Sequence, residues 1–341
     1  MLRTPNLVLL ASALTEACQD LYARRLAATL DVPVQSLAGR TPLADEAAYT
    51  AARAAWEGLD AETRPLIALS VLPAFAPFAS QLGARRAVVL AHQPLAEASG
   101  LPEAEREWLA VAERQVLAFS PDLIASSEAA AEAIVREAAV PRGRITVIAP
   151  PTPALARVRG SGGPNVRILA KGALLGASAH EVLLTALAGL ADLDWQLCIA
   201  GAAPDADYAT SLMRLVGELG LVSRVRFAQP TADATEHEAL WQATDLFALA
   251  ATGPGYRMEV AAALKRGVPV AICGDPATAP EIPPEAGAIA PPGDHAQLAK
   301  VLRRLVFDGA LRREMAEAAW RAGSALPQGE AAAARLAAAL G

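Results

Sequence analysis

Residues 165–201 read NVRILAKGALLGASAHEVLLTALAGLADLDWQLCIAG, and this stretch decides the fold class. Two short apolar runs, Val166–Ala170 and Gln196–Ala200, enclose the alanine- and leucine-rich segment Ala179–Gly189, which is typical of an amphipathic helix. A strand, a helix and a second strand in this order form the unit from which parallel sheets are built. The stretch therefore predicts a parallel sheet with helices on its faces.

The same alternation continues on both sides of this unit. Upstream, we expect strands at Asn6–Ser12, Val32–Leu37, Leu66–Leu72, Ala87–Ala91, Leu123–Ser126 and Ile145–Ile148, and helices at Glu16–Leu30, Asp45–Leu59, Pro102–Phe119 and Glu128–Ala138. Downstream, we expect strands at Val225–Ala228, Leu246–Ala250, Pro269–Cys273 and Ala288–Ala290, and helices at Tyr208–Leu219, Glu236–Ala243, Met258–Arg266, Ala296–Phe307 and Leu311–Ala322. The pattern predicts two doubly wound, Rossmann-type α/β domains that face a central cleft, where such folds bind ligands.

A proline- and glycine-rich segment, Ala149–Pro164, separates the two series and marks the interdomain linker. We expect an N-terminal domain over residues 1–155 and a C-terminal domain over residues 156–324. Residues 325–341 are predicted to form a helix that packs back on the N-terminal domain.

Composition excludes several classes of protein. Of the 341 residues, 53% are hydrophobic and 19% are charged, so the chain is not disordered. A net charge of −6 argues against nucleic acid as a partner. Cys18, Cys198 and Cys273 lack the spacing of a disulfide framework or a metal site, which favours a cytoplasmic protein without a metal. The uncharged run Pro65–Ala84 is broken by prolines and is not expected to span a membrane, and Leu7–Leu14 is interpreted as strand rather than secretion signal.

Several motifs carry a family resemblance. In the second half these are Arg224-Val-Arg-Phe, Leu240-Trp-Gln-Ala-Thr-Asp-Leu-Phe, Pro254-Gly-Tyr-Arg-Met, Gly267-Val-Pro-Val and Ala290-Pro-Pro-Gly-Asp. In the first half they are Gly39-Arg-Thr-Pro-Leu-Ala-Asp and Leu90-Ala-His-Gln-Pro-Leu-Ala-Glu-Ala-Ser-Gly-Leu. Their order over nearly the whole chain resembles the GT-B glycosyltransferases, and among them the retaining, nucleotide-sugar-dependent family four.

The resemblance implies a donor and an acceptor half of the site. A nucleoside diphosphate sugar would lie in the C-terminal domain, and its departing diphosphate would be stabilised by cations or by main-chain N–H groups at a helix N-terminus. The family usually supplies an Arg, a Lys and a Glu-x7-Glu element there, without a metal or other cofactor. The acceptor would lie against the N-terminal domain, beside the loop that contains His92.

The sequence departs from the family at most of these positions. The two glutamates align with Pro254 and Ala262, the lysine with Ser178, the arginine with Ala173, and a glycine pair of the N-terminal domain with Cys18 and Gln19. His92 is retained, as are acidic positions at Glu97, Glu113 and Asp294, the last as the expected cap of the following helix.

The candidate site residues each have two interpretations. His92 contacts the acceptor or is a buried structural imidazole. Lys171, beside Gly172, replaces a missing phosphate-binding cation or is a charge at a strand end.

The segment Gly255-Tyr256-Arg257-Met258-Glu259 opens a helix whose N-terminus attracts anions. Arg257 either binds the diphosphate or fills the donor pocket, and Glu259 either replaces a lost carboxylate or only complements the helix dipole. His237 and His295 are expected to be exposed.

Three functions follow from these observations. The first is an active retaining glycosyltransferase with an altered donor site. The second is a catalytically inactive pseudo-glycosyltransferase that acts as a partner or regulator of an active paralogue or of another protein. The third is a non-catalytic protein that binds a nucleotide.

Overall fold

The computed structural model describes residues 6–13, 18–39, 42, 44–97, 102–119, 122–203, 205–229, 233–251, 255–278 and 282–341. The chain divides into two compact units. The first unit comprises Met1–Pro151, Pro254–Tyr256 and Pro327–Gly341, and the second comprises Thr152–Gly253 and Arg257–Leu326.

The first unit is built on a parallel six-stranded sheet with the order β2-β1-β3-β4-β5-β6. Its strands are β1 (Asn6–Ser12), β2 (Val34–Leu37), β3 (Thr63–Ala68), β4 (Val88–Ala91), β5 (Asp122–Ala125) and β6 (Ile145–Val147). Its helices are α1 (Cys18–Ala28), α2 (Glu46–Glu57), α3 (Glu103–Leu117), α4 (Glu128–Ala138) and α11 (Gly329–Leu340). Short 3-10 turns are η1 (Leu69–Gln81), η2 (Gly83–Arg85), η3 (Leu95–Glu97) and η4 (Arg142–Arg144).

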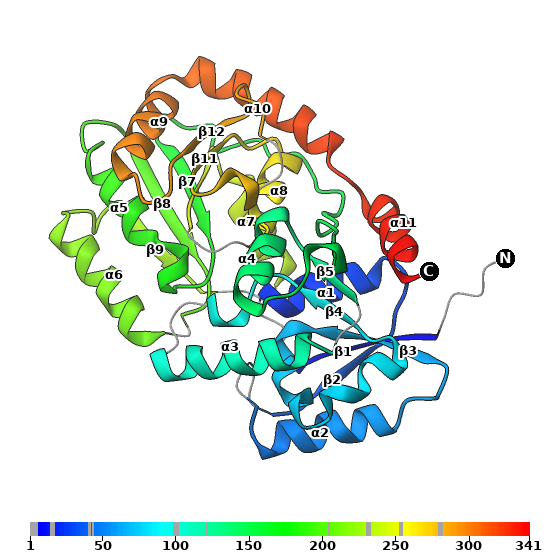
Figure 1. The fold of residues 1–341 in the computed structure, drawn as a ribbon. Helices are drawn as coiled ribbons and strands as arrows, with labels where there is room; N and C mark the ends of the chain where they lie inside the picture. The colour runs from blue at the N-terminus through cyan, green and yellow to red at the C-terminus, as the bar shows by residue number, and fades with distance from the viewer. Residues whose placement is uncertain are drawn as a thin grey trace. The chain divides into compact units, whose positions relative to one another are not determined.

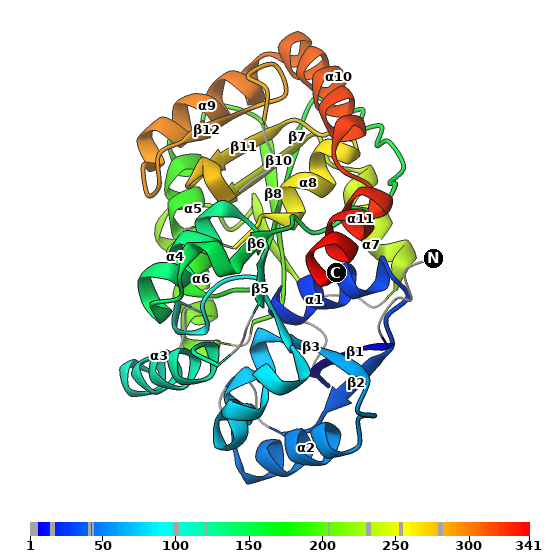
Figure 2. The same ribbon diagram turned by 45° about the vertical axis from the view of Figure 1, so that its right-hand side comes forward.

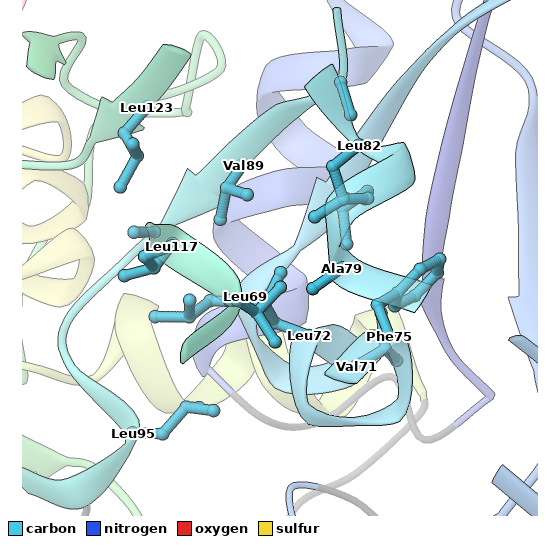
Figure 3. Close-up of a cluster of buried hydrophobic side chains, with 14 of the residues drawn as sticks. Leu69, Val71, Leu72, Phe75, Ala79, Leu82, Val89, Leu95, Leu117 and Leu123 are labelled. Carbon is cyan, nitrogen blue, oxygen red and sulfur yellow. The ribbon is translucent and has the colours of Figure 1, made fainter. Parts of the chain in front are cut away.

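Two apolar clusters cover the two faces of this sheet. One joins α2, η1, α3 and α4 to the sheet, and the close-up in Figure 3 shows its centre around Leu69, Leu72 and Phe75. The other joins α1 and α11, which lie side by side although they stand at opposite ends of the chain (Figure 2). Both faces are covered, as buried parallel strands require.

The prediction of a strand over Leu66–Leu72 is wrong in its second half. The strand ends at Ala68, and the chain then continues as the 3-10 segment η1, which contains Pro73 and Pro77. A buried strand and an apolar 3-10 segment have the same composition, and the prolines that distinguish them lie after the predicted strand. The run is nevertheless largely buried, because its side chains form the centre of the first cluster.

The second unit repeats the architecture with the strand order β12-β11-β10-β7-β8-β9, again parallel throughout (Figure 1). Its strands are β7 (Val166–Lys171), β8 (Trp195–Ala200), β9 (Val225–Ala228), β10 (Leu246–Ala250), β11 (Val270–Cys273) and β12 (Gly287–Ala290). Its helices are α5 (His180–Ala188), α6 (Ala206–Glu218), α7 (Ala234–Gln242), α8 (Met258–Lys265), α9 (His295–Phe307) and α10 (Gly309–Ala325), with turns η5 (Gly176–Ser178) and η6 (Pro276–Thr278).

Helices cover both faces of the second sheet as well. One apolar cluster packs α5, α6 and α9 on one face, and another packs α7, α8 and α10 on the other. The doubly wound α/β class predicted from the sequence is therefore confirmed in each unit. Within the described ranges, none of the helices combines the length and apolarity that crossing a bilayer requires.

Candidate functional site

The second sheet reverses its strand order between β10 and β7, which are hydrogen-bonded neighbours. The chain leaves β7 for α5 on one face and leaves β10 for α8 on the other. A crevice opens at such a switch point, outside the carboxyl ends of the strands, and ligands of doubly wound folds bind there. Lys171 and Gly172 from the end of β7, and Arg257, Met258 and Glu259 at the start of α8, therefore belong to one edge of the sheet.

The two helices that follow β7 and β10, the strands of this switch point, differ from the other helices of the unit in their N-terminal caps. Helices α6, α7, α9 and α10 each begin with an aspartate whose side chain accepts a main-chain N–H: Asp205, Asp233, Asp294 and Asp308. Helices α5 and α8 begin with Ala179 and Arg257, and neither makes a side-chain cap hydrogen bond. The positive ends of their dipoles are thus left without a carboxylate cap, which suits an anion. The predicted cap at Asp294 is confirmed.

The main chain is unusually close-packed where β7 and β8 end. A Cβ atom added to Gly201 would lie 1.9 Å from the carbonyl oxygen of Gly172. The Gly172 N–H donates to the Ala200 carbonyl (3.2 Å), and the Leu174 N–H donates to the Ala202 carbonyl (2.7 Å). Glycine at position 201 therefore lets the β7–α5 loop lie directly against the end of β8.

Lys171 points toward α7. Its Nζ lies 2.7 Å from Nε2 of His237 and 5.8 Å from the centre of the Trp241 ring. Burial lowers the pKa of His237, and the charges of Lys171 and Arg266 lower it further, so the imidazole is neutral and accepts from the ammonium. The prediction that His237 is exposed is wrong: the side chain is half-buried on α7, where it contacts Lys171.

The β7–α5 loop is held by neutral groups. The Ser178 hydroxyl donates to the Ala173 carbonyl (2.5 Å), so the positions aligned with the family's lysine and arginine bond to each other. The next imidazole, His180, is 1% exposed, and burial lowers its pKa. Neither Ala173 nor Ser178 supplies a positive charge to the crevice.

At the start of α8, the Arg257 N–H donates to the Thr278 carbonyl (2.7 Å). Met258 is buried, whereas Arg257 and Glu259 are partly exposed. Pro254, aligned with the first family glutamate, lies outside the described residues, and Ala262, aligned with the second, has no carboxylate.

In the first unit, His92 follows β4 and is 4% exposed. Its carbonyl accepts from the Ser126 hydroxyl (2.7 Å), and its ring lies 6.0 Å from that of Tyr22. Gly255 and Tyr256 are grouped with this unit, where their N–H groups donate to Gln93 Oε1 (3.2 Å) and Ser126 Oγ (3.3 Å).

The switch point of the first sheet, between β1 and β3, is occupied by a carboxylate. Asp20 in the first turn of α1 is 0% exposed, and its Oδ1 accepts from the Ser12 N–H and the Ser70 hydroxyl, both at 2.9 Å. Burial raises the pKa of Asp20, and the neighbouring Arg24 lowers it. An internal acid therefore takes the place at which an anionic ligand would approach this helix.

Comparison with known proteins finds a family similarity within the second unit. The family described as glycosyl transferases group 1 matches residues 165–308, the part of the chain that holds the β7–β10 switch point. Residues 165–308 are therefore similar to a group 1 glycosyl transferase domain. A comparison with curated protein sequences gives no match.

Solved structures extend the likeness to the whole chain at the level of fold. HepE from Anabaena in complex with UDP-glucose is 18% identical, with a TM-score of 0.77 over 97% of this chain and 98% of that one. Sucrose-phosphate synthase from Thermosynechococcus elongatus is 19% identical, with a TM-score of 0.74 over 97% of each chain. WaaG, a glycosyltransferase of lipopolysaccharide biosynthesis, is 16% identical, with a TM-score of 0.67 over 96% and 98%. The chain thus shares the two-domain GT-B fold of these enzymes.

In the second unit, Lys171 and Gly172 follow β7, and Arg257, Met258 and Glu259 follow its neighbour β10, whereas His92, Gly255 and Tyr256 are grouped with the first unit. From the sequence we expected an anion at the start of α8 but assigned no function to the start of α5. The missing aspartates before α5 and α8 were the available signal.

Glu113 on α3 was noted in the sequence but given no role. It is 2% exposed, on the helix face that also carries the buried Leu109 and Val116. The sequence signal for a buried carboxyl group was an acidic residue at a position of the helix repeat that is otherwise apolar. Within the described residues of both units, no group of three or more His, Cys, Asp or Glu side chains is placed to hold a metal ion.

Proposed function

We propose that the chain binds a nucleoside diphosphate sugar at the β7–β10 switch point and transfers the sugar, with retention, to an acceptor held by the first unit. The observation that supports this most strongly is the pair of helices, α5 and α8, that begin at the switch point without a carboxylate cap. Other helices of the unit place an aspartate at this position, which would repel a diphosphate.

The proposed chemistry needs charge stabilisation on the leaving diphosphate. The N-terminal N–H groups of the two helices would supply part of it, and the side chains of Arg257 and Lys171 the rest. Because Gly172 and Gly201 have no side chains, the main chains at the ends of β7 and β8 pack closely together. We propose that phosphate oxygens can therefore approach the main chain there. His92 is proposed as the acceptor-side polar group, and Glu259 as the nearest carboxylate at the start of α8.

A second function, binding without turnover, is favoured by the neutral β7–α5 loop. Ser178 and Ala173 bond to each other where the family has its two cations, and Ala262 replaces a glutamate. Removing one group that stabilises transition-state charge typically costs about 10²–10³ in rate. A pseudo-glycosyltransferase that binds a nucleotide and regulates an active paralogue or another protein would need only the uncapped helices.

The first experiment is a thermal-shift and calorimetric comparison of UDP, GDP, ADP and their glucose conjugates, followed by a turnover assay. UDP-glucose is the first donor to test, because it is bound in HepE. Ligand at 100 times its Kd should stabilise the protein by about 2.7 kcal/mol. Binding with sugar release or transfer supports the first function, and binding without either supports the second.

A matched pair of variants locates the ligand. Arg257→Ala should weaken binding by roughly ten- to a hundredfold, as expected for a lost charge-assisted hydrogen bond. Arg167→Ala, at the other end of β7, should leave the affinity unchanged. If no nucleotide binds, or if both variants behave alike, the proposed site is wrong.

A further inference from the structure

Glu113 lies inside the first unit and has no part in the chemistry proposed above. Its Oε2 accepts the N–H of Leu95 (3.1 Å), and the N–H of Ala96 also lowers the pKa of the carboxyl group. Its Oε1 is buried and makes no hydrogen bond. A carboxyl group in such a position is costly unless its hydrogen bonds offset the loss of water.

The two N–H groups belong to η3, the turn that begins three residues after His92. This turn and His92 are tethered at several points. The Ser126 hydroxyl binds the His92 carbonyl, Arg136 of α4 binds the Glu97 carboxylate (2.7 Å), and the Leu95 side chain is part of the apolar cluster seen in Figure 3. None of these three contacts involves a main-chain N–H group of the turn. Glu113 provides that contact, from the buried side of the turn.

The N-terminal N–H groups of a helical turn have no partner within the turn, and they are expensive to bury unsatisfied. Leu109 and Val116 show that the position of Glu113 faces the core, where an apolar side chain would pack without any penalty for charge. Such a side chain would leave the Leu95 and Ala96 N–H groups without this acceptor. The carboxyl group therefore fixes the main chain rather than adding to the packing.

We propose that Glu113 is the positioning residue of the loop His92–Glu97: its buried carboxyl group holds the turn η3 and thereby sets where His92 is presented. This proposal rests on the proposed function insofar as His92 is the acceptor-side group. Glu113 acts through the loop and does not touch substrate.

The surroundings of Glu113 make this tether sensitive to pH. The pKa of Glu113 is raised to about 8: burial raises it, the N–H groups of Leu95 and Ala96 lower it, and the carboxylates of Glu97 and Glu137 raise it. Arg136 pairs with Glu97 and Glu137, and η1, packed against α3, contains no titratable side chain. His92 is the remaining titratable group on the loop.

The N–H groups of the turn lower the pKa of Glu113, so ionisation should strengthen the hydrogen bonds of the turn as the pH rises through about 8, although burial of the new charge lowers the stability of the unit as a whole.

The test measures amide hydrogen exchange over residues 90–97 in the full-length protein, between pH 6.5 and 9.5, for four proteins. These are the wild type, Glu113→Ala, Glu113→Gln and the control Glu107→Gln, which alters an exposed glutamate of the same helix. We expect Glu113→Ala to lower the protection of Leu95 and Ala96 at least about tenfold. Glu113→Gln should restore most of it because its amide oxygen still accepts both N–H groups, but without the rise near pH 8 that the wild type shows.

The proposal is overturned if Glu113→Ala leaves the protection of both amides unchanged, or if Glu113→Gln exchanges as fast as Glu113→Ala. It is also overturned if the loss of protection spreads evenly over α3, because the role is then general packing. UDP affinity should be equal in all four proteins, since the donor site lies in the other unit. If the wild type bound none of UDP, GDP and ADP, the proposed function would be refuted, whereas the exchange data alone decide the role of Glu113 in the loop.

Discussion

Replacing Gly201 by alanine tests the close approach of the β7–α5 loop to β8. The new Cβ would lie 1.9 Å from the Gly172 carbonyl oxygen and 2.6 Å from its carbonyl carbon, so main chain and not a flexible side chain must move. Overpacking of this kind typically costs about 1–3 kcal/mol. Strain on the hydrogen bonds from Gly172 to Ala200 and from Leu174 to Ala202 adds about 1 kcal/mol each if they break.

The expected loss for Gly201→Ala is therefore roughly 2–4 kcal/mol, or roughly 5–15 °C in the Tm of the second unit. Urea unfolding followed by tryptophan fluorescence reports on this unit through the buried Trp195 and Trp241. UDP affinity, measured at a temperature where the variant is folded, should fall as well, because the displaced loop borders the switch point.

Gly217→Ala is the matched control, because nothing lies within 4 Å of the added Cβ and the residue is inside helix α6. It should raise stability by about 0.5–1 kcal/mol, the usual gain of alanine over glycine in a helix. If Gly201→Ala unfolds at the same urea concentration as the wild type, the two main-chain segments are not in contact, and the argument for a backbone-lined phosphate site is refuted.

Three further outcomes are expected. The pKa of Glu113 is raised from 4.5 to about 8, so the folded chain keeps a proton that the unfolded chain releases; stability falls with pH between these values, by about 1.4 kcal/mol per unit. The free energy of unfolding, measured in urea at pH 5.5, 6.5 and 7.5, should therefore fall with this slope for the wild type relative to Glu113→Gln. If the free energies of the two proteins changed in parallel with pH, the prediction would be contradicted. Lys171→Met should raise the pKa of His237 in an NMR titration, because a positive charge 2.7 Å away is removed; an unchanged pKa would mean that burial alone sets it. Asp308→Ala should cost about 1 kcal/mol in thermal unfolding, since two N–H groups of α10 lose their acceptor, and a neutral result would show that water replaces it.

The sheets were predictable because their signal is local. A buried parallel strand such as Leu246–Ala250 is a continuous apolar run, and its predicted limits are those of the structure. Val225–Ala228 was equally clear, although it is an edge strand. The error at Leu66–Leu72 arose because an apolar 3-10 segment and a buried strand have the same composition, and only the prolines that follow distinguish them.

The site was less predictable because its main features depend on contacts between distant residues. The sequence shows Lys171 beside a glycine, but not that the ammonium lies against His237, which is 66 residues away. It shows a serine at position 178, but not that the hydroxyl bonds to the Ala173 carbonyl. Helix caps are local, so the absence of an aspartate before α5 and α8 was available from the sequence and became meaningful only with the strand order.

The two switch points explain why one fold can carry different roles in its two units. In the first, the buried carboxyl group of Asp20 bonds to Ser12 and Ser70 and places an acid in the first turn of α1. In the second, neither flanking helix carries a capping acid, and Lys171 and Arg257 lie at the same sheet edge. Glu181 and Glu259 stand in the first turns of α5 and α8, but neither caps its helix, so the two cations favour a diphosphate at the second switch point over the first. This difference in charge at the helix starts is our reason for proposing the donor site in the second unit and the acceptor site in the first.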